Sequence, residues 1–254
     1  MIKISAVSYL NTKPFIHGLE IAPVDGISLS LDNPADCARK LLTGEVDLGL
    51  IPVAIIPQLK EAHIISDFCI GADGPVESVK LYSHVPLSEI KTILLDYQSR
   101  TSVTLVRILA KELWGISPEW KKAEPGFETE ILNSTAGVVI GDRTFVMNGT
   151  FPFEFDLPEE WKKLTELPFV FACWVANKEL PASFIENFNL AMEAGLQDIG
   201  KVIEKESGNF SPFDVEKYLT KSLNLRLNDQ GKAAIDLFLK KLKELPPLPC
   251  NPCC

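Results

Sequence analysis

Short apolar strands and amphipathic helices alternate in the first fifty or so residues, and this alternation limits the possible folds more than any other feature. Residues 3–9 form a short apolar-rich segment, and apolar residues alternate with serines over 27–31, as in a half-buried strand. Residues 14–19 and 34–42 carry apolar side chains at helical spacing, and 46–53 predict a third strand. The order β-α-β-α-β favours a parallel sheet with right-handed crossovers, so we predict an α/β protein.

A second unit of the same kind follows. Strands are predicted at residues 91–95, 137–140 and 169–175, with a helix after the first of them. After Pro181 the pattern is helical as far as Leu245. Two α/β units joined without a flexible tether suggest two lobes around a cleft. We expect residues 1–90 and 173–254 in the first lobe and residues 91–172 in the second.

Composition narrows the possible partners. With 254 residues, 46% of them apolar, the chain can bury a sizeable core. Its net charge of 25 − 34 = −9 disfavours binding to nucleic-acid phosphates and to anionic lipid. No apolar run is long enough to span a membrane, and residues 1–8 lack the apolar core of a signal peptide. We therefore expect a cytoplasmic monomer or weak homodimer that binds a small molecule, with no nucleic acid and no membrane partner.

Metal and cofactor sites are not predicted. The three histidines are dispersed, and the glycine-rich motifs that cradle nucleotide phosphates are absent from the sequence. Cys37, Cys69 and Cys173 each stand among apolar neighbours, which is typical of small buried residues. The other three cysteines crowd the tail at Cys250, Cys253 and Cys254, where the second half of a zinc site is lacking. We expect no metal and no organic cofactor.

The candidate binding site comprises the polar residues that directly follow predicted strands. In open α/β sheets, ligands bind at the carboxyl ends of the strands. Three loops hold such residues: Ser8, Tyr9, Asn11 and Thr12 in the first, Ser99, Arg100, Thr101 and Ser102 in the second, and Gly141 and Asp142 in the third.

The first two loops also open helices, whose N-termini favour anions. Two such termini, one in each lobe, could hold a dicarboxylate, with Arg100, Thr101 and Ser102 binding one carboxylate. The same residue types are ordinary helix caps, so each loop could instead be purely structural.

Several segments resemble one family. Residues 7–15 are similar to the opening signature of the chorismate dehydratase family of menaquinone biosynthesis. Residues 42–52, 96–103 and 167–174 match further family segments in the same order, as does the short run at 140–142. The likeness spans most of residues 1–180, the C-terminal helices match only in kind, and the cysteine-rich tail has no counterpart in the family pattern.

The resemblance implies a type II periplasmic-binding-protein-like fold, with two lobes and a ligand in the cleft between them. It also implies that chorismate loses water to give 3-[(1-carboxyvinyl)oxy]benzoate in the futalosine route. A sister enzyme that makes 1,4-dihydroxy-6-naphthoate shares the fold, but its Pro-Cys-Pro opening is missing here. A non-catalytic small-anion-binding protein and a ligand-sensing module remain alternatives.

Within this resemblance, Asn11 and Ser78 are the predicted catalytic residues. Asn11 lies in the first-lobe loop, and Ser78 opens a strand that we expect to face the cleft. Either could donate a hydrogen bond to the departing hydroxyl or to the ring carboxylate. The candidate loops hold one acid, Asp142, and no His, Lys or Glu. The substrate's own enolpyruvyl carboxylate is therefore an alternative base, and Asp142 could instead cap or hold its neighbours.

Overall fold

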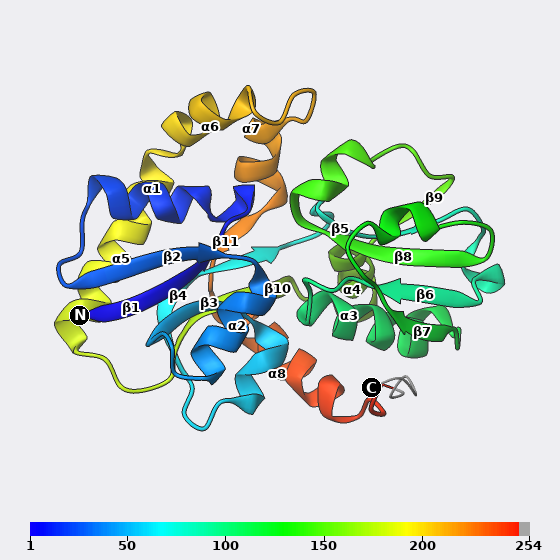
Figure 1. The fold of residues 1–254 in the computed structure, drawn as a ribbon, viewed down its shortest axis with the longest axis horizontal. Coiled ribbons are helices and arrows are strands. Elements are labelled where there is room, and N and C mark those ends of the chain that lie inside the picture. Colours follow the sequence, from blue (N-terminus) through cyan, green and yellow to red (C-terminus); the bar gives the residue numbers. More distant parts are fainter. Residues whose placement is uncertain (249–254) are drawn as a thin grey trace.

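The computed structural model describes residues 1–248 and folds them into two lobes, each built on its own β-sheet (Figure 1). The first sheet has the strand order β11-β4-β10-β3-β1-β2, and the second has the order β7-β6-β8-β5-β9. The predicted two-lobed α/β architecture is confirmed. Cys250, Cys253 and Cys254 lie outside the described residues.

The first lobe is built from the first and last parts of the described chain. Its strands are β1 (Ile2–Val7), β2 (Ile27–Asp32), β3 (Leu48–Pro52), β4 (His63–Ala72), β10 (Phe169–Ala176) and β11 (Asn224–Arg226). Its helices are α1 (Lys13–Ile21), α2 (Pro34–Leu42), α5 (Ala182–Gln197), α6 (Ile199–Ser207), α7 (Val215–Lys217) and α8 (Asp229–Lys243). Strand β1 pairs in parallel with β2 and β3, as the β-α-β-α-β pattern predicts, whereas β10 is antiparallel to β3 and β4.

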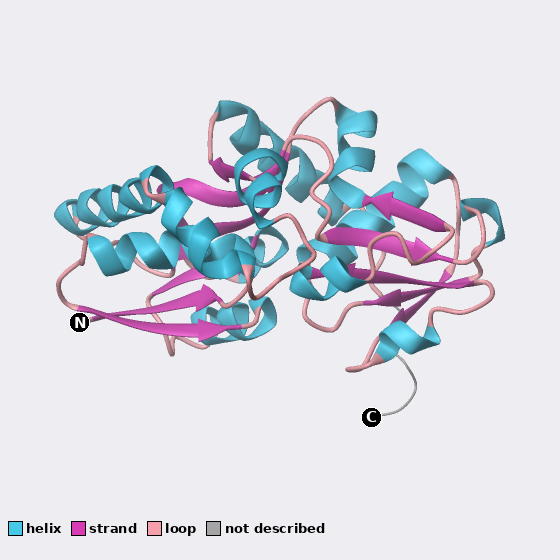
Figure 2. Cartoon of the chain, turned by 90° about the horizontal axis from the view of Figure 1, so that it is seen from above, coloured by secondary structure: helices cyan, strands magenta, loops and turns pink. Residues whose placement is uncertain are grey.

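The second lobe is smaller and also mixed in strand direction. Its strands are β5 (Val79–Ser83), β6 (Thr92–Leu95), β7 (Glu119–Lys122), β8 (Thr135–Ile140) and β9 (Phe153–Asp156), and its helices are α3 (Thr101–Leu109) and α4 (Leu157–Thr165). Strand β6 is parallel to β7 and β8, while β5 is antiparallel to β8 and β9. Figure 2 shows the two sheets side by side, with helices packed around each.

The boundaries between the lobes differ from those predicted from the sequence. The sequence pattern assigns residues 1–90 to the first lobe, but β5 is hydrogen-bonded within the second sheet. Strand β10 begins at Phe169 and belongs to the first sheet, ahead of the predicted boundary at residue 173. The chain thus crosses between the sheets at residues 73–78 and 166–168. An apolar strand pattern does not reveal which sheet the strand will join, because both sheets offer the same backbone partners.

Local capping fixes where the helices start. Asn33 accepts a hydrogen bond from the Asp36 backbone N–H (2.9 Å), and Pro34 occupies the first turn of α2. Pro14 plays the same part in α1. Both prolines have a fixed φ suited to a first helical turn, where their missing N–H has no intrahelical partner to lose. Helix α2 therefore begins two residues after β2 ends, whereas α1 begins after the helical turn Leu10–Thr12 that follows β1.

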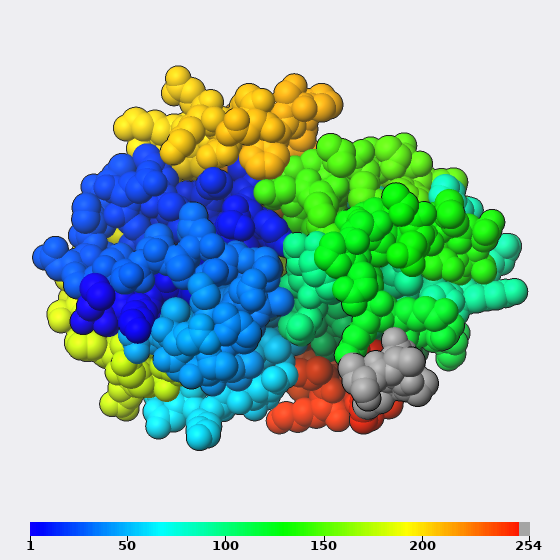
Figure 3. All heavy atoms as spheres, viewed as in Figure 1, coloured from blue at the N-terminus to red at the C-terminus, as the bar shows by residue number. Residues whose placement is uncertain are grey.

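The two lobes touch over a broad front (Figure 3). The segment that includes α7, coloured orange, lies above the junction, and helix α8, coloured red, lies below it. No helix within residues 1–248 is both long and apolar enough to cross a membrane.

Candidate active site

A cavity lies between the two lobes at the carboxyl ends of β1, β3 and β8. The space that the centres of water-sized molecules can occupy in it is about 60 Å³, so the chamber is narrow. From the first lobe it is lined by Val7, Tyr9, Asn11, Pro34, Pro52, Ile70, Phe171, Ala172 and Leu223. From the second lobe and the first crossing it is lined by Val76, Ser78, Val79, Ser99, Thr101, Ser102, Ile140 and Gly141.

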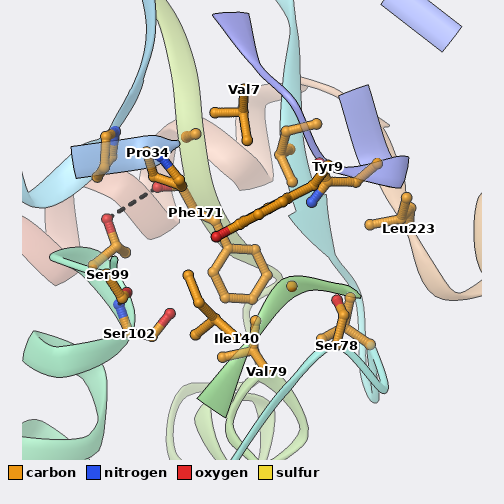
Figure 4. Close-up of a pocket in the computed structure, with 17 residues that line it drawn as sticks. Val7, Tyr9, Pro34, Ser78, Val79, Ser99, Ser102, Ile140, Phe171 and Leu223 are labelled. Atoms are coloured by element: carbon orange, nitrogen blue, oxygen red, sulfur yellow. Dashed lines mark hydrogen bonds between the residues drawn. The ribbon is translucent and has the colours of Figure 1, made fainter. Parts of the chain in front are cut away.

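The cavity is apolar with a few polar groups at defined places. In Figure 4 the Tyr9 ring extends across its centre, with Ser99 and Ser102 on one side and Ser78 on the other. Phe171 and Ile140 supply broad apolar walls. None of the lining residues is Asp, Glu, His, Lys or Arg. An anionic ligand would therefore meet hydroxyls, an amide and a helix terminus rather than a formal positive charge.

Asn11 and Ser78 reach the same cavity from different parts of the chain. Asn11 belongs to the turn between β1 and α1, and Ser78 directly precedes β5 at the first crossing between lobes. Ser78 is only 2% exposed, and its Oγ lies 2.8 Å from the hydroxyl of Tyr218, which donates to it. The two residues predicted to be catalytic thus share one chamber.

The N-terminus of α3 forms the opposite side of the cavity. The Ser99 Oγ accepts the Ser102 backbone N–H (3.1 Å), so it caps the helix. The Thr101 hydroxyl donates to the Phe171 carbonyl oxygen (3.0 Å) and accepts the Ala54 N–H (3.3 Å). Two of the three predicted hydroxyls are thus already engaged in bonds that hold the helix, and Thr101 ties it to the first lobe.

Further contacts join the lobes beside the cavity. The Tyr9 hydroxyl hydrogen-bonds the side chain of Gln98, and the Asp142 carboxylate accepts the Leu10 backbone N–H, with both oxygens at 3.2 Å. Gly141 lies directly under the Tyr9 ring and has a φ of +69°. A Cβ at this position would meet the ring at 2.8 Å, so only glycine satisfies both the backbone and the contact. These contacts hold the lobes together in a closed arrangement.

Four predicted binding residues do not line this cavity. Ser8 is exposed, and the buried Thr12 donates its hydroxyl to Asn11 Oδ1 (3.1 Å). The exposed Arg100 donates to the carbonyl oxygens of Tyr97 and Ser99, and Asp142 holds Leu10 as described. Successive side chains in a helical turn point about 100° apart. Only some side chains of each loop can therefore face the cavity.

Asp142 offers a test of the closed arrangement through pH. Burial raises the pKa of its carboxyl from 3.8 to about 6, although the Leu10 N–H favours the charged form. The folded protein therefore binds this proton more tightly than the unfolded chain, so stability falls as pH rises from about 4 to about 6. We expect Asp142→Asn, which keeps an acceptor for Leu10, to raise the melting temperature at pH 8. The gain should vanish at about pH 4. Thermal unfolding of both proteins at the two pH values measures this, and a lower melting temperature at pH 8 would contradict it.

Sequence reasoning missed several cavity residues. Pro34, Pro52 and Leu223 line the cavity, and Tyr218 supports it from behind. In the sequence, Pro34 is only the first residue of the predicted helical segment 34–42. Tyr218 and Leu223 lie in the C-terminal segment, far from any predicted strand end, and carried no local signal.

Two α/β lobes joined by two crossings, with a cavity between them at the strand ends, define the periplasmic-binding-protein-like class. Solved structures agree on the fold. A protein from Archaeoglobus fulgidus matches with a TM-score of 0.76 at 15% identity, over 96% of this chain and 97% of that one. A Candida albicans protein described as having the generic periplasmic binding protein fold gives 0.66 at 15% identity, over 97% and 91%. The alkanesulfonate-binding protein from Xanthomonas axonopodis pv. citri gives 0.64 at 16% identity, over 97% and 94%.

The sequence relationships are more specific. The family model described as menaquinone biosynthesis matches residues 2–244. A chorismate dehydratase from Thermus thermophilus is 30% identical over 257 aligned positions, covering 92% of each chain. The chain therefore belongs to the menaquinone biosynthesis family, as residues 7–15 and the other matching segments predicted.

Proposed function

We propose that this protein is a chorismate dehydratase. It removes water from chorismate to give 3-[(1-carboxyvinyl)oxy]benzoate, as a carbon–oxygen lyase of the futalosine route to menaquinone, and acts in the cytoplasm. The observation that carries the proposal is the inter-lobe cavity, in a chain that aligns over 92% of its length with a relative named chorismate dehydratase.

The cavity suits the substrate. Chorismate carries an apolar diene ring and two carboxylates. Phe171 and Ile140 offer walls for the ring, while Ser78, Asn11 and the α3 terminus offer hydrogen-bond donors for charge and for the leaving hydroxyl. Of the residues predicted to bind substrate, Tyr9, Ser99, Thr101, Ser102 and Gly141 line this cavity and keep that role in the proposal.

The reaction removes one ring C–H proton and the neighbouring hydroxyl, and the ring becomes aromatic. Because no carboxylate, imidazole or amine lines the cavity, no side chain there is an obvious base. The Asp142 carboxylate is held by Leu10. We therefore assign proton removal to the enolpyruvyl carboxylate of the substrate, which is tethered close to the reacting carbon. The protein gains rate by folding that arm over the ring, since an intramolecular base has a high effective molarity.

The test is turnover by the purified protein. We expect it to consume chorismate and to release the benzoate product, separated by chromatography and identified by mass. An ester of the enolpyruvyl carboxylate is expected to compete for binding without reacting, because it lacks the base. Conversion of the ester at the rate of chorismate would contradict the assignment of the base.

Chorismate binding is measured separately from turnover. Binding of chorismate with no product would favour the non-catalytic anion-binding alternative. Failure to bind chorismate at all would contradict the proposed substrate.

A further inference from the structure

Tyr218 is a buried polar residue that the reaction as outlined above does not use. It opens the helical turn Tyr218–Ser222 after α7, is 1% exposed, and is not among the residues that line the cavity. Its hydroxyl donates a hydrogen bond to Ser78 Oγ (2.8 Å). One buried phenol therefore stands behind Ser78, one of the two residues that we propose as catalytic.

The donors and acceptors in this group fix one direction for the hydrogen bonds. A tyrosine hydroxyl has one proton, and here it goes to Ser78 Oγ. Because Ser78 accepts from Tyr218, its own proton remains available to the cavity.

Charge state and packing support this arrangement. Burial raises the pKa of Tyr218, so the phenol stays protonated and acts as a donor, not as a base. Its ring packs edge-on against Phe145 at 5.2 Å and Phe213 at 5.4 Å, measured between ring centroids. Phe145 and Phe213 stack on each other at 3.6 Å, so residues from both lobes hold the ring. The hydroxyl has little freedom to point elsewhere.

We propose that Tyr218 is a positioning residue that orients the Ser78 hydroxyl, so that Ser78 donates into the cavity to the substrate. Donation runs from Tyr218 to Ser78 and then to the reacting molecule. This inference rests on the proposed dehydratase function, and it adds a residue of the C-terminal segment that never touches the substrate.

The first experiment replaces only the hydroxyl. Tyr218→Phe keeps the ring packed between Phe145 and Phe213, and we expect it to lower kcat about tenfold with KM changed less than twofold. The matched control is Tyr82→Phe, because the Tyr82 hydroxyl is also buried and donates to Asn148 Oδ1 (2.9 Å), away from the cavity. The control should lose similar stability and keep the wild-type kcat.

The second experiment asks whether Tyr218 acts through Ser78. In the Ser78→Ala background, Tyr218→Phe is expected to cause no further loss of kcat, because the hydroxyl that it orients is gone. Independent effects of the two substitutions, multiplying to a larger loss in the double variant, would overturn the proposal.

The remaining outcomes are separable. A Tyr218→Phe enzyme with wild-type kcat, or with the same kcat loss as Tyr82→Phe, overturns the positioning role while the dehydratase function stands. If the wild-type protein binds chorismate but does not convert it, the proposed function is wrong, and the proposed role of Tyr218 is wrong as well.

Discussion

Ser78→Ala is expected to lower the kcat for chorismate dehydration by about a hundredfold or more, the usual consequence of losing a hydrogen-bond donor to developing charge. Asn11→Ala should have an effect of the same order. Ser78→Ala also leaves the Tyr218 hydroxyl without its acceptor, at a cost of about 1–3 kcal/mol of stability, so the melting temperature should fall by a few degrees. We expect the variant to stay folded at the assay temperature, so that its loss of turnover is a loss of chemistry.

Ser83→Ala is the matched control for this prediction. Ser83 ends β5, the strand that Ser78 precedes, and it is fully buried. Its hydroxyl donates to the Val85 carbonyl oxygen (2.8 Å) and accepts the Val85 N–H (3.1 Å), so its removal also breaks buried hydrogen bonds. We expect a similar fall in melting temperature with normal turnover. Equal turnover in Ser78→Ala, Asn11→Ala and Ser83→Ala would show that the first two residues are only structural.

Gly195→Ala is expected to destabilise the protein by about 3 kcal/mol, which lowers the melting temperature by about 6–12 °C for a chain of this size. Helices α1 and α5 are in backbone contact at Gly18 and Gly195. A Cβ on Gly195 would lie 2.0 Å from the Pro14 carbonyl oxygen, and one on Gly18 would lie 2.0 Å from that of Ala191. Backbone atoms cannot turn aside as side chains do, so the helices must separate.

Gly200→Ala is the control for the helix contact. Gly200 lies near the start of α6 and is exposed. A Cβ added at this position would have no neighbouring atom within 4 Å. Alanine in a helix is favoured over glycine by about 0.5–1 kcal/mol, so this variant should be as stable as the wild type or slightly more so. Thermal unfolding of the two variants decides the point, and equal melting temperatures would contradict the close α1–α5 contact. Turnover should also fall in Gly195→Ala, because α1 begins two residues after Asn11.

Much of the site could be predicted because it follows strand ends. Tyr9, Asn11, Ser99 and Gly141 each come within four residues of the end of an apolar strand, and each lines the cavity. The directions of neighbouring side chains could not be predicted in the same way. Arg100 has the charge expected of a carboxylate ligand, yet its guanidinium bonds to carbonyl oxygens of its own loop and is exposed.

Most of the elements, the α/β class and the family could be predicted from the sequence, but strand β11 lies in a stretch after Pro181 that was predicted to be helical throughout. Hydrophobic period and capping residues are local properties, and the motif at residues 7–15 is a contiguous string, so both can be read without a structure. The pairing of β5 with the second sheet, the contact of Asp142 with Leu10 and the place of Tyr218 behind Ser78, 140 positions away, follow from tertiary packing alone. Such contacts depend on how distant segments pack, and many local patterns are compatible with more than one partner. Neighbours along the chain set the local conformation of a residue, whereas neighbours in space set the chemistry of its side chain.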